Sequence, residues 1–215
     1  MVEAHERYIS EGSAEEKAAI DGHIAAIERV HLVPASIAPV AVRTGETGPE
    51  HSTVSIPGKH DTKISSPDGA IVVEEIVLCP QMLEDFNSTT HEIGHSLDLN
   101  ALGGRLSATD KLTDHWFSAQ PETQEWRRAV QRSVAFDRLS TARIDMEKQA
   151  YYLLPVELWA RSYEQWIATR SGDRDLREKI ERRRADVPGL YWEEGEFGPV
   201  GEALEALFVT RGLVK

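Results

Sequence analysis

The chain has a single cysteine and no long run of apolar residues. Because Cys79 is the only cysteine among 215 residues, an intrachain disulfide and a cysteine-rich zinc site are both excluded. No apolar run approaches the length that crosses a bilayer. The first residues also lack the basic stretch and following apolar stretch of a Sec-type signal. We therefore expect a cytoplasmic protein, and export by a machine that reads no N-terminal signal stays open.

Basic residues are also fewer than acidic ones. The chain has 24 Lys and Arg against 36 Asp and Glu, which gives a formal net charge of −12. Because nucleic acids and anionic membranes attract basic surfaces, we expect neither as a partner. Three arginines stand together at 182–184, but acidic residues flank them, and a solvated helix face is expected there. The length suits one domain, 1–215, with a substantial core.

The first part of the chain, 13–79, is expected to hold a helix followed by strands. The helix covers 13–30, where Ser13 and Glu16 can form a capping box and isoleucines recur on one face. Strands are predicted at 33–42, 53–56 and 70–78. The last of these is the strongest, whereas the prolines of the first favour an edge position or an extended entry.

The rest of the chain is expected to be helical. A helix over 87–100 ends at the glycine pair 103–104. The C-terminal helical part, 120–215, has predicted helices at 122–134, 144–149, 155–169, 173–185 and 199–210. A helix, a few strands and then a run of helices indicate the α+β fold class.

The helix over 87–100 contains the sequence His-Glu-Ile-Gly-His. Residues four apart lie on one face of a helix, so His91 and His95 can present two imidazole nitrogens to one metal ion. Glu92 is offset by one residue, which places its carboxylate beside the metal, where it can take a proton from a metal-bound water. The alternative is a chance match on an ordinary helix. The ligand types favour zinc, although other divalent ions suit the same donors.

Two further residues of this helix suggest roles. Gly94 lacks a side chain, which would let another segment approach the helix beside the ligands. Asp98 lies three residues past His95 on roughly the same face and is expected to orient a ligand histidine; the alternative is a helix-surface acid. A metzincin would need glycine at the position of Asp98 and His or Asp at the position of Ala101, so that class is excluded.

A catalytic zinc usually has three protein ligands, so a third must be found. Glu157 lies in an apolar, aromatic helix, where a buried carboxylate needs a cation or a metal as partner. Glu164, two turns further along the same face, is the competing ligand. The other alternative is an ion pair between Glu157 and Arg161 at i,i+4.

These residues are similar to the sequence pattern of a known family. The segments 88–98 and 151–164 resemble gluzincin-type metallopeptidases, above all the anthrax-lethal-factor-like and phage-associated zincin domains. The resemblance implies a zincin-like fold, Glu157 as third ligand, and a small mixed sheet whose edge strand, 71–78, lies beside the active-site helix and binds a peptide. It also implies an oxyanion-stabilising tyrosine, for which Tyr151 and Tyr152 are both candidates; a packed core tyrosine is the alternative for either. More loosely, 191–212 resembles the end of zincins encoded beside phage head proteins.

The expected function is hydrolysis of peptide bonds by a zinc-bound water that Glu92 activates, with a peptide or protein as substrate. Delivery in a phage particle or by a specialised secretion system is one expected setting. Two alternatives stay open: a zincin-fold binding or structural module without turnover, and hydrolysis of a non-peptide amide. Five other histidines are expected to be surface or capping residues: His5, His23, His31, His51 and His60. His115 is either a residue of the cleft or unrelated to the site.

Overall fold

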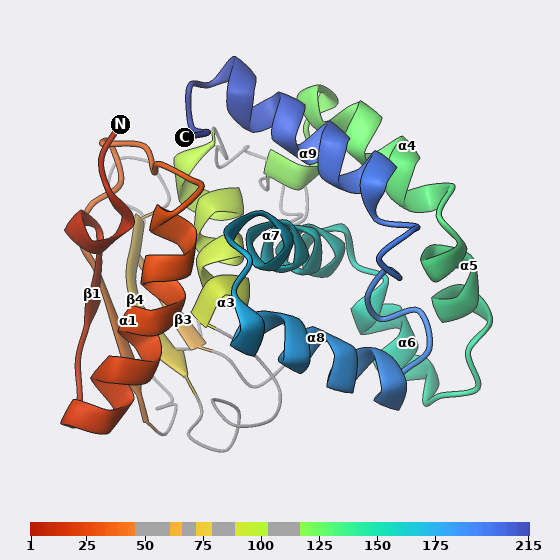
Figure 1. Cartoon of the computed structure of the whole chain (residues 1–215), viewed down its shortest axis with the longest axis horizontal. Helices are drawn as coiled ribbons and strands as arrows, with labels where there is room; N and C mark the ends of the chain where they lie inside the picture. The colour runs from red at the N-terminus through yellow and green to blue at the C-terminus, as the bar shows by residue number, and fades with distance from the viewer. Residues whose placement is uncertain (46–60, 66–71, 79–88, 103–116) are drawn as a thin grey trace.

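A computed structural model describes residues 1–45, 61–65, 72–78, 89–102 and 117–215 of the protein. Within them a small sheet lies beside a larger helical part, with the order β1-β2-β4-β3 (Figure 1). Strands β1 (Tyr8–Ser10), β2 (Val40–Thr44) and β4 (Val72–Leu78) are parallel, and β3 (Asp61–Ser65) runs antiparallel to β4. The protein is therefore α+β and mostly helical, as predicted.

The strand predicted at 70–78 is present, but its predicted position at the sheet edge is wrong. β4 pairs with β2 on one side and with β3 on the other, so it is an interior strand. Val73, Ile76 and Val77 are buried, which explains why this stretch has the most continuous β-branched pattern in the chain. Among the described residues, the edge beside β4 belongs to β3.

The first helix, α1 (Ala14–Glu28), connects β1 to β2 and packs against both strands and against α3 (Thr89–Ser96). The predicted capping box is confirmed, because Ser13 accepts the amide of Glu16 at 3.3 Å and Glu16 accepts that of Ser13 at 2.8 Å. These reciprocal bonds fix the point at which the chain leaves β1 and enters the helix.

The strand predicted at 33–42 is right only in its second half. β2 begins at Val40, while Val33 makes an isolated bridge with Val2 and a turn closes between Pro34 and Ile37. Proline has no N–H for a ladder, so the extended entry was the correct alternative. The short strand β1 was not predicted. The strand expected at 53–56 lies outside the described residues.

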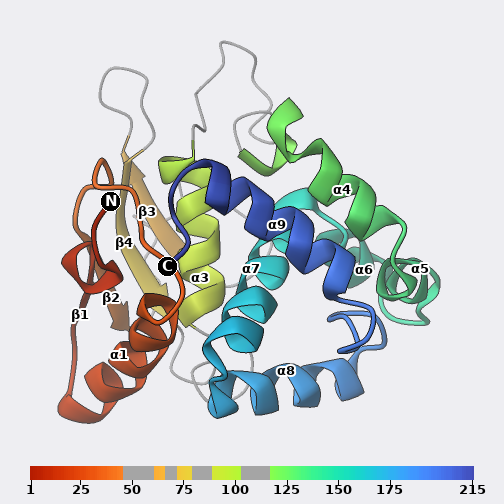
Figure 2. The same cartoon turned by 45° about the horizontal axis from the view of Figure 1, so that its top comes forward.

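Helix α7 (Pro155–Ser171) is the centre of the helical part, with other helices around it (Figures 1 and 2). Its neighbours are α3 with the π-helical turn Leu97–Ala101, α8 (Arg174–Asp186) and α9 (Gly198–Thr210). The helices predicted at 155–169, 173–185 and 199–210 are thus confirmed. The smaller ones are α4 (Gln124–Gln131), α5 (Val134–Thr141) and α6 (Met146–Tyr152).

The helix predicted at 122–134 ends earlier, because Ser133 accepts the amide of Phe136 and starts α5, which the sequence had not indicated. The helix predicted at 144–149 is present as α6, which begins two residues later and ends three residues later.

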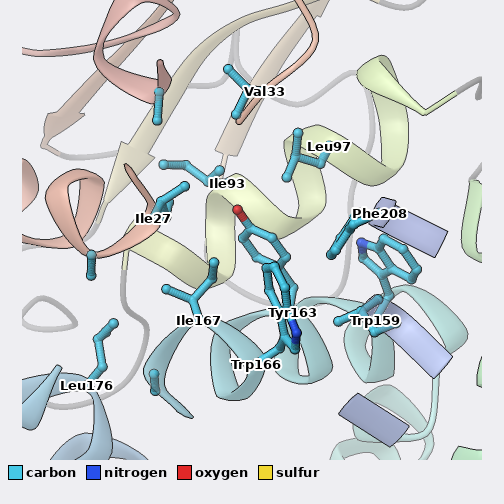
Figure 3. Packing of buried hydrophobic residues seen from close by; sticks show 14 of the residues in the cluster. Ile27, Val33, Ile93, Leu97, Trp159, Tyr163, Trp166, Ile167, Leu176 and Phe208 are labelled. Atoms are coloured by element: carbon cyan, nitrogen blue, oxygen red, sulfur yellow. The ribbon is translucent and has the colours of Figure 1, made fainter. Parts of the chain in front are cut away.

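Between α7, α9 and the sheet lies an aromatic core. Trp159, Tyr163, Trp166 and Phe208 pack edge-to-face or tilted against one another, and Ile93 of α3 lies beside them (Figure 3). Ring pairs of this kind add about 0.5–1.5 kcal/mol each beyond the area they bury. These ring contacts join α7 to α9, and Ile93 of α3 belongs to the same core. None of the described helices has the length and apolar character needed to cross a membrane.

Candidate metal centre

Helix α3 presents the two motif histidines to α7. Every residue of Thr89–Ser96 is buried, and the rings of His91 and His95 have centroids 4.8 Å apart. The start of the helix is held from α1, because the amide of Thr89 donates to Nδ1 of His23 at 3.1 Å. A first-turn amide of α3 thus has a side-chain acceptor from another helix.

The expected close approach at Gly94 is confirmed. A Cβ at this position would lie 3.2 Å from the Cα of Ala160 and 3.1 Å from Cδ1 of Tyr163. The indole N–H of Trp159 donates to the carbonyl of Gly94 at 3.1 Å. α3 and α7 therefore touch backbone to backbone between the two histidines, which brings the first turn of α7 to the imidazoles.

Glu157, in the first turn of α7, lies next to these two imidazoles. Its Oε1 lies 3.1 Å from Nε2 of His95 and its Oε2 lies 3.5 Å from Nε2 of His91. These three buried residues offer ligand atoms within 4.8 Å of one another, a group that could hold a metal ion. Two ligands of a tetrahedral zinc, each about 2.0–2.1 Å from the ion, lie about 3.3 Å apart. The separations of 3.1 and 3.5 Å between Glu157 and the two imidazoles are of this size.

The alternative partner of Glu157 is present too. Arg161, also buried, approaches Oε2 of Glu157 at 3.6 Å and donates to the carbonyl of Tyr152. Its guanidinium lies 5.6 Å from the ring centroid of Tyr152. Glu157 thus faces the histidines and Arg161 together, and the two predicted contacts do not exclude each other.

The charges of this group act strongly on its pKa values. Burial lowers the pKa of His91, but the carboxylates of Glu157 and Glu164 outweigh it and raise the pKa to about 9. Burial alone would raise the pKa of Glu157, yet the two histidines hold it well below its usual range. The two shifts have opposite signs because the carboxylate and the imidazole each stabilise the charged form of the other.

The two candidate tyrosines occupy different places. The hydroxyl of Tyr151 donates to Oε1 of Glu157 at 2.6 Å, so it lies at the ligand group. Tyr152 instead lies against Arg161. Burial, together with the nearby charges of Glu157 and Glu92, raises the pKa of Tyr151 and keeps it a proton donor.

Glu164, the competing ligand, reaches the other side of His91. Its Oε2 lies 3.5 Å from Nδ1 of His91, whereas Glu157 faces Nε2. The same oxygen accepts the hydroxyl of Tyr191. Glu164 is not part of the three-residue group.

Glu92 and Asp98 are both buried. The charge of Glu92 contributes to the raised pKa values of His91 and Tyr151. Oδ1 of Asp98 accepts the amide of Ser118 at 2.6 Å. Burial raises the pKa of Asp98 to about 7 against the lowering effects of Ser118 and the charge of His95. Asp98 is therefore no helix-surface acid, and its hydrogen bond goes to Ser118.

The remaining histidines are only partly as expected. His5 is exposed and pairs with Glu28, and His23, although buried, accepts a first-turn amide of α3, so the expected surface or capping role fits both. His31 is buried and bonds to the hydroxyl of Tyr163, so the expectation is wrong for it. Sequence reasoning could not find either buried position, because each is defined by contacts more than sixty residues away. His51, His60, His115 and Cys79 lie outside the described residues.

Comparison with known proteins adds no relative. No protein-family model, no curated protein and no solved structure matches this chain. What the chain does must therefore be argued from the geometry of His91, His95 and Glu157.

Proposed function

We propose that this protein is a zinc-dependent metallopeptidase of the gluzincin type. One observation carries the proposal: helices α3 and α7 bring His91, His95 and Glu157 together, buried, with ligand atoms within 4.8 Å. Two histidines at i,i+4 and a carboxylate from a second helix match the ligand number of a catalytic zinc, which leaves a coordination position for water or substrate.

The chemistry requires a base beside the ligands. A zinc ion held by His91, His95 and Glu157 would lower the pKa of a bound water toward neutrality and polarise a carbonyl oxygen. Glu92 follows His91 directly and would accept the proton of the attacking water and pass it to the leaving amine. Tyr151 is the tyrosine we assign to the oxyanion, since its hydroxyl lies at the ligand group while Tyr152 lies against Arg161.

A peptide substrate suits the sheet next to α3. Among the described residues β3 has a strand on one side only, and its outer edge can pair with an extended peptide through main-chain hydrogen bonds. We therefore propose β3, in place of β4, as the strand along which the substrate lies. β3 belongs to the same sheet as β4, which packs against α3.

The proposal is tested with the Glu92→Gln variant. Wild-type protein, freed of metal and reloaded with one equivalent of zinc, should cleave members of a broad peptide library. Glu92→Gln should keep its zinc and lose activity by at least about a hundredfold, the size of a general-base contribution. Glu147→Gln, an exposed acid of α6, is the matched control and should match wild type.

Two results would contradict the proposal. Equal cleavage by wild type and Glu92→Gln would show that Glu92 is not the base. Stoichiometric zinc without cleavage of any library member would instead favour a binding or structural module.

A further inference from the structure

A chain of ion pairs and hydrogen bonds leads from the ligand group to the C-terminal part of the molecule. It begins at His91, whose two ring nitrogens face different carboxylates of α7. Nε2 lies 3.5 Å from Glu157 and Nδ1 lies 3.5 Å from Glu164. A metal-binding histidine usually gives its second ring N–H to a carboxylate, which fixes the ring orientation and the tautomer. Glu164 has the position of that carboxylate.

Glu164 is itself held by a tyrosine from outside α3 and α7. The hydroxyl of Tyr191 donates to Oε2 of Glu164, and Nη1 of Arg183 donates to the oxygen of that hydroxyl at 2.8 Å. Glu164 and Tyr191 are each 1% exposed. Since a buried carboxylate is costly without partners, the Tyr191 hydroxyl stabilises its charge and sets its direction.

The segment that carries Tyr191 has a fixed place on α7. The side-chain amide of Gln165 accepts the N–H of Trp192 at 3.1 Å and donates to its carbonyl at 2.8 Å. Gly189, at a φ of 83°, leads into the segment, and a Cβ there would lie 2.3 Å from the carbonyl oxygen of Ala135. The backbone on both sides of Tyr191 is thus constrained, and its hydroxyl is presented rigidly to Glu164.

We propose that Glu164, Tyr191 and Arg183 form a positioning chain that orients His91 for metal binding. Glu164 is thereby a positioning residue and not a ligand. Of the arginine run at 182–184, Arg183 is partly buried and belongs to this chain, while Arg182 is exposed. The inference rests on the proposed metal centre and adds to it a dependence on residues about a hundred positions beyond the histidine motif.

The test measures zinc affinity, by competition with a chromogenic chelator, on the full chain. Glu164→Gln should weaken zinc binding by about 10- to 100-fold, the usual effect of removing such a partner. Tyr191→Phe should weaken it by about tenfold, the lower end of that range, because Glu164 stays in place. Tyr163→Phe is the matched control: it also removes a buried hydroxyl of the α7 region, one that bonds to His31, and should bind zinc as wild type does.

A second pair of variants separates positioning from general destabilisation. Arg183→Gln should weaken zinc binding, and Arg182→Gln, its exposed neighbour, should not. The visible spectrum of the Co²⁺-loaded protein reports the ligand set. It should keep its wild-type intensity in Tyr191→Phe and change in Glu157→Ala. Thermal unfolding of the metal-free proteins checks that each variant is folded, and if Glu164→Gln does not fold, Tyr191→Phe decides.

Each other outcome is informative. Wild-type affinity in Tyr191→Phe would overturn the positioning chain and leave the metallopeptidase proposal intact. A Glu164→Gln protein that loses stoichiometric metal and has the spectrum of Glu157→Ala would make Glu164 a ligand and also overturn the chain. If wild-type protein binds no zinc, the proposed function and this inference both fail.

Discussion

Replacing Gly94 by alanine should separate the two helices that hold the ligands. The added Cβ would lie 3.1 Å from Cδ1 of Tyr163 and 3.2 Å from the Cα of Ala160. A ring can tilt, but the Cα belongs to the backbone of α7, so the helices must move apart by a few tenths of an ångström. Alanine gains about 1 kcal/mol over glycine as a helix former. Overpacking costs about 1–3 kcal/mol, so we expect a net loss of about 0–2 kcal/mol in the free energy of unfolding.

Gly22 of α1 supplies the matched control. A Cβ there would meet nothing within 4 Å, so Gly22→Ala keeps the gain in helix propensity without a clash. It should raise the free energy of unfolding by about 0.5–1 kcal/mol. Urea unfolding of the metal-free proteins measures both changes, and the difference between the two variants isolates the cost of the contact.

Zinc affinity gives the second measure of Gly94→Ala. His91 and His95 move with α3 and Glu157 moves with α7, and a metal site tolerates errors of only about 0.2 Å in its ligand distances. We expect weaker zinc binding in Gly94→Ala and unchanged binding in Gly22→Ala. If Gly94→Ala stabilises the protein as much as Gly22→Ala does and binds zinc equally well, the argument from the α3–α7 contact is refuted.

Two other predictions concern a buried histidine and the third ligand. Burial lowers the pKa of His31 from its usual value to about 3. The unfolded chain thus takes up the proton near pH 6.5 and the folded one does not, so the stability from neutral His31 is complete above pH 6.5 and is lost as the pH falls toward 3. Between pH 6.5 and 5 the loss is about 2 kcal/mol, and His31→Gln should show a flatter fall of the urea midpoint; an equal slope would contradict the assignment. Glu157→Ala should abolish stoichiometric zinc in a metal analysis after dialysis, whereas Glu164→Ala should keep zinc at reduced affinity; the reverse result would exchange their roles.

The residues of the ligand group could be predicted from the sequence because each is marked by its neighbours along the chain. The spacing of His91 and His95 places both on one helical face wherever the helix lies, and Glu157 stood out because a carboxylate in an apolar helix needs a positive partner. The structure brings these three together. The choice between Glu157 and Glu164 could not be made from periodicity, because two turns of α7 present both acids on one face. Both lie near His91, and only Glu157 also reaches His95.

The errors concern long-range contacts. The sequence of β4 does not say how many strands flank it, so the edge position that the resemblance implies is wrong for this interior strand. His31 has a polar side chain in a short connection, and only the approach of Tyr163, Trp166 and Phe208 makes its site a core. Likewise, the role of Tyr191 depends on a turn that requires Gly189, whose neighbours come from α5.

The end of the described chain is joined to its beginning. The amide of Leu32 donates to the carbonyl of Leu213, His31 forms a bridge with Val214, and the amide of Lys215 donates to the carbonyl of Val30. During synthesis on a ribosome, the sheet and the histidine motif emerge first; α7 follows about 60 residues after His95, and α9 and these last pairings follow more than a hundred residues after that histidine. A nascent chain therefore exposes His91 and His95 before their carboxylate partner exists. The group of His91, His95 and Glu157 can therefore assemble only after α7 has been synthesised and has packed against α3.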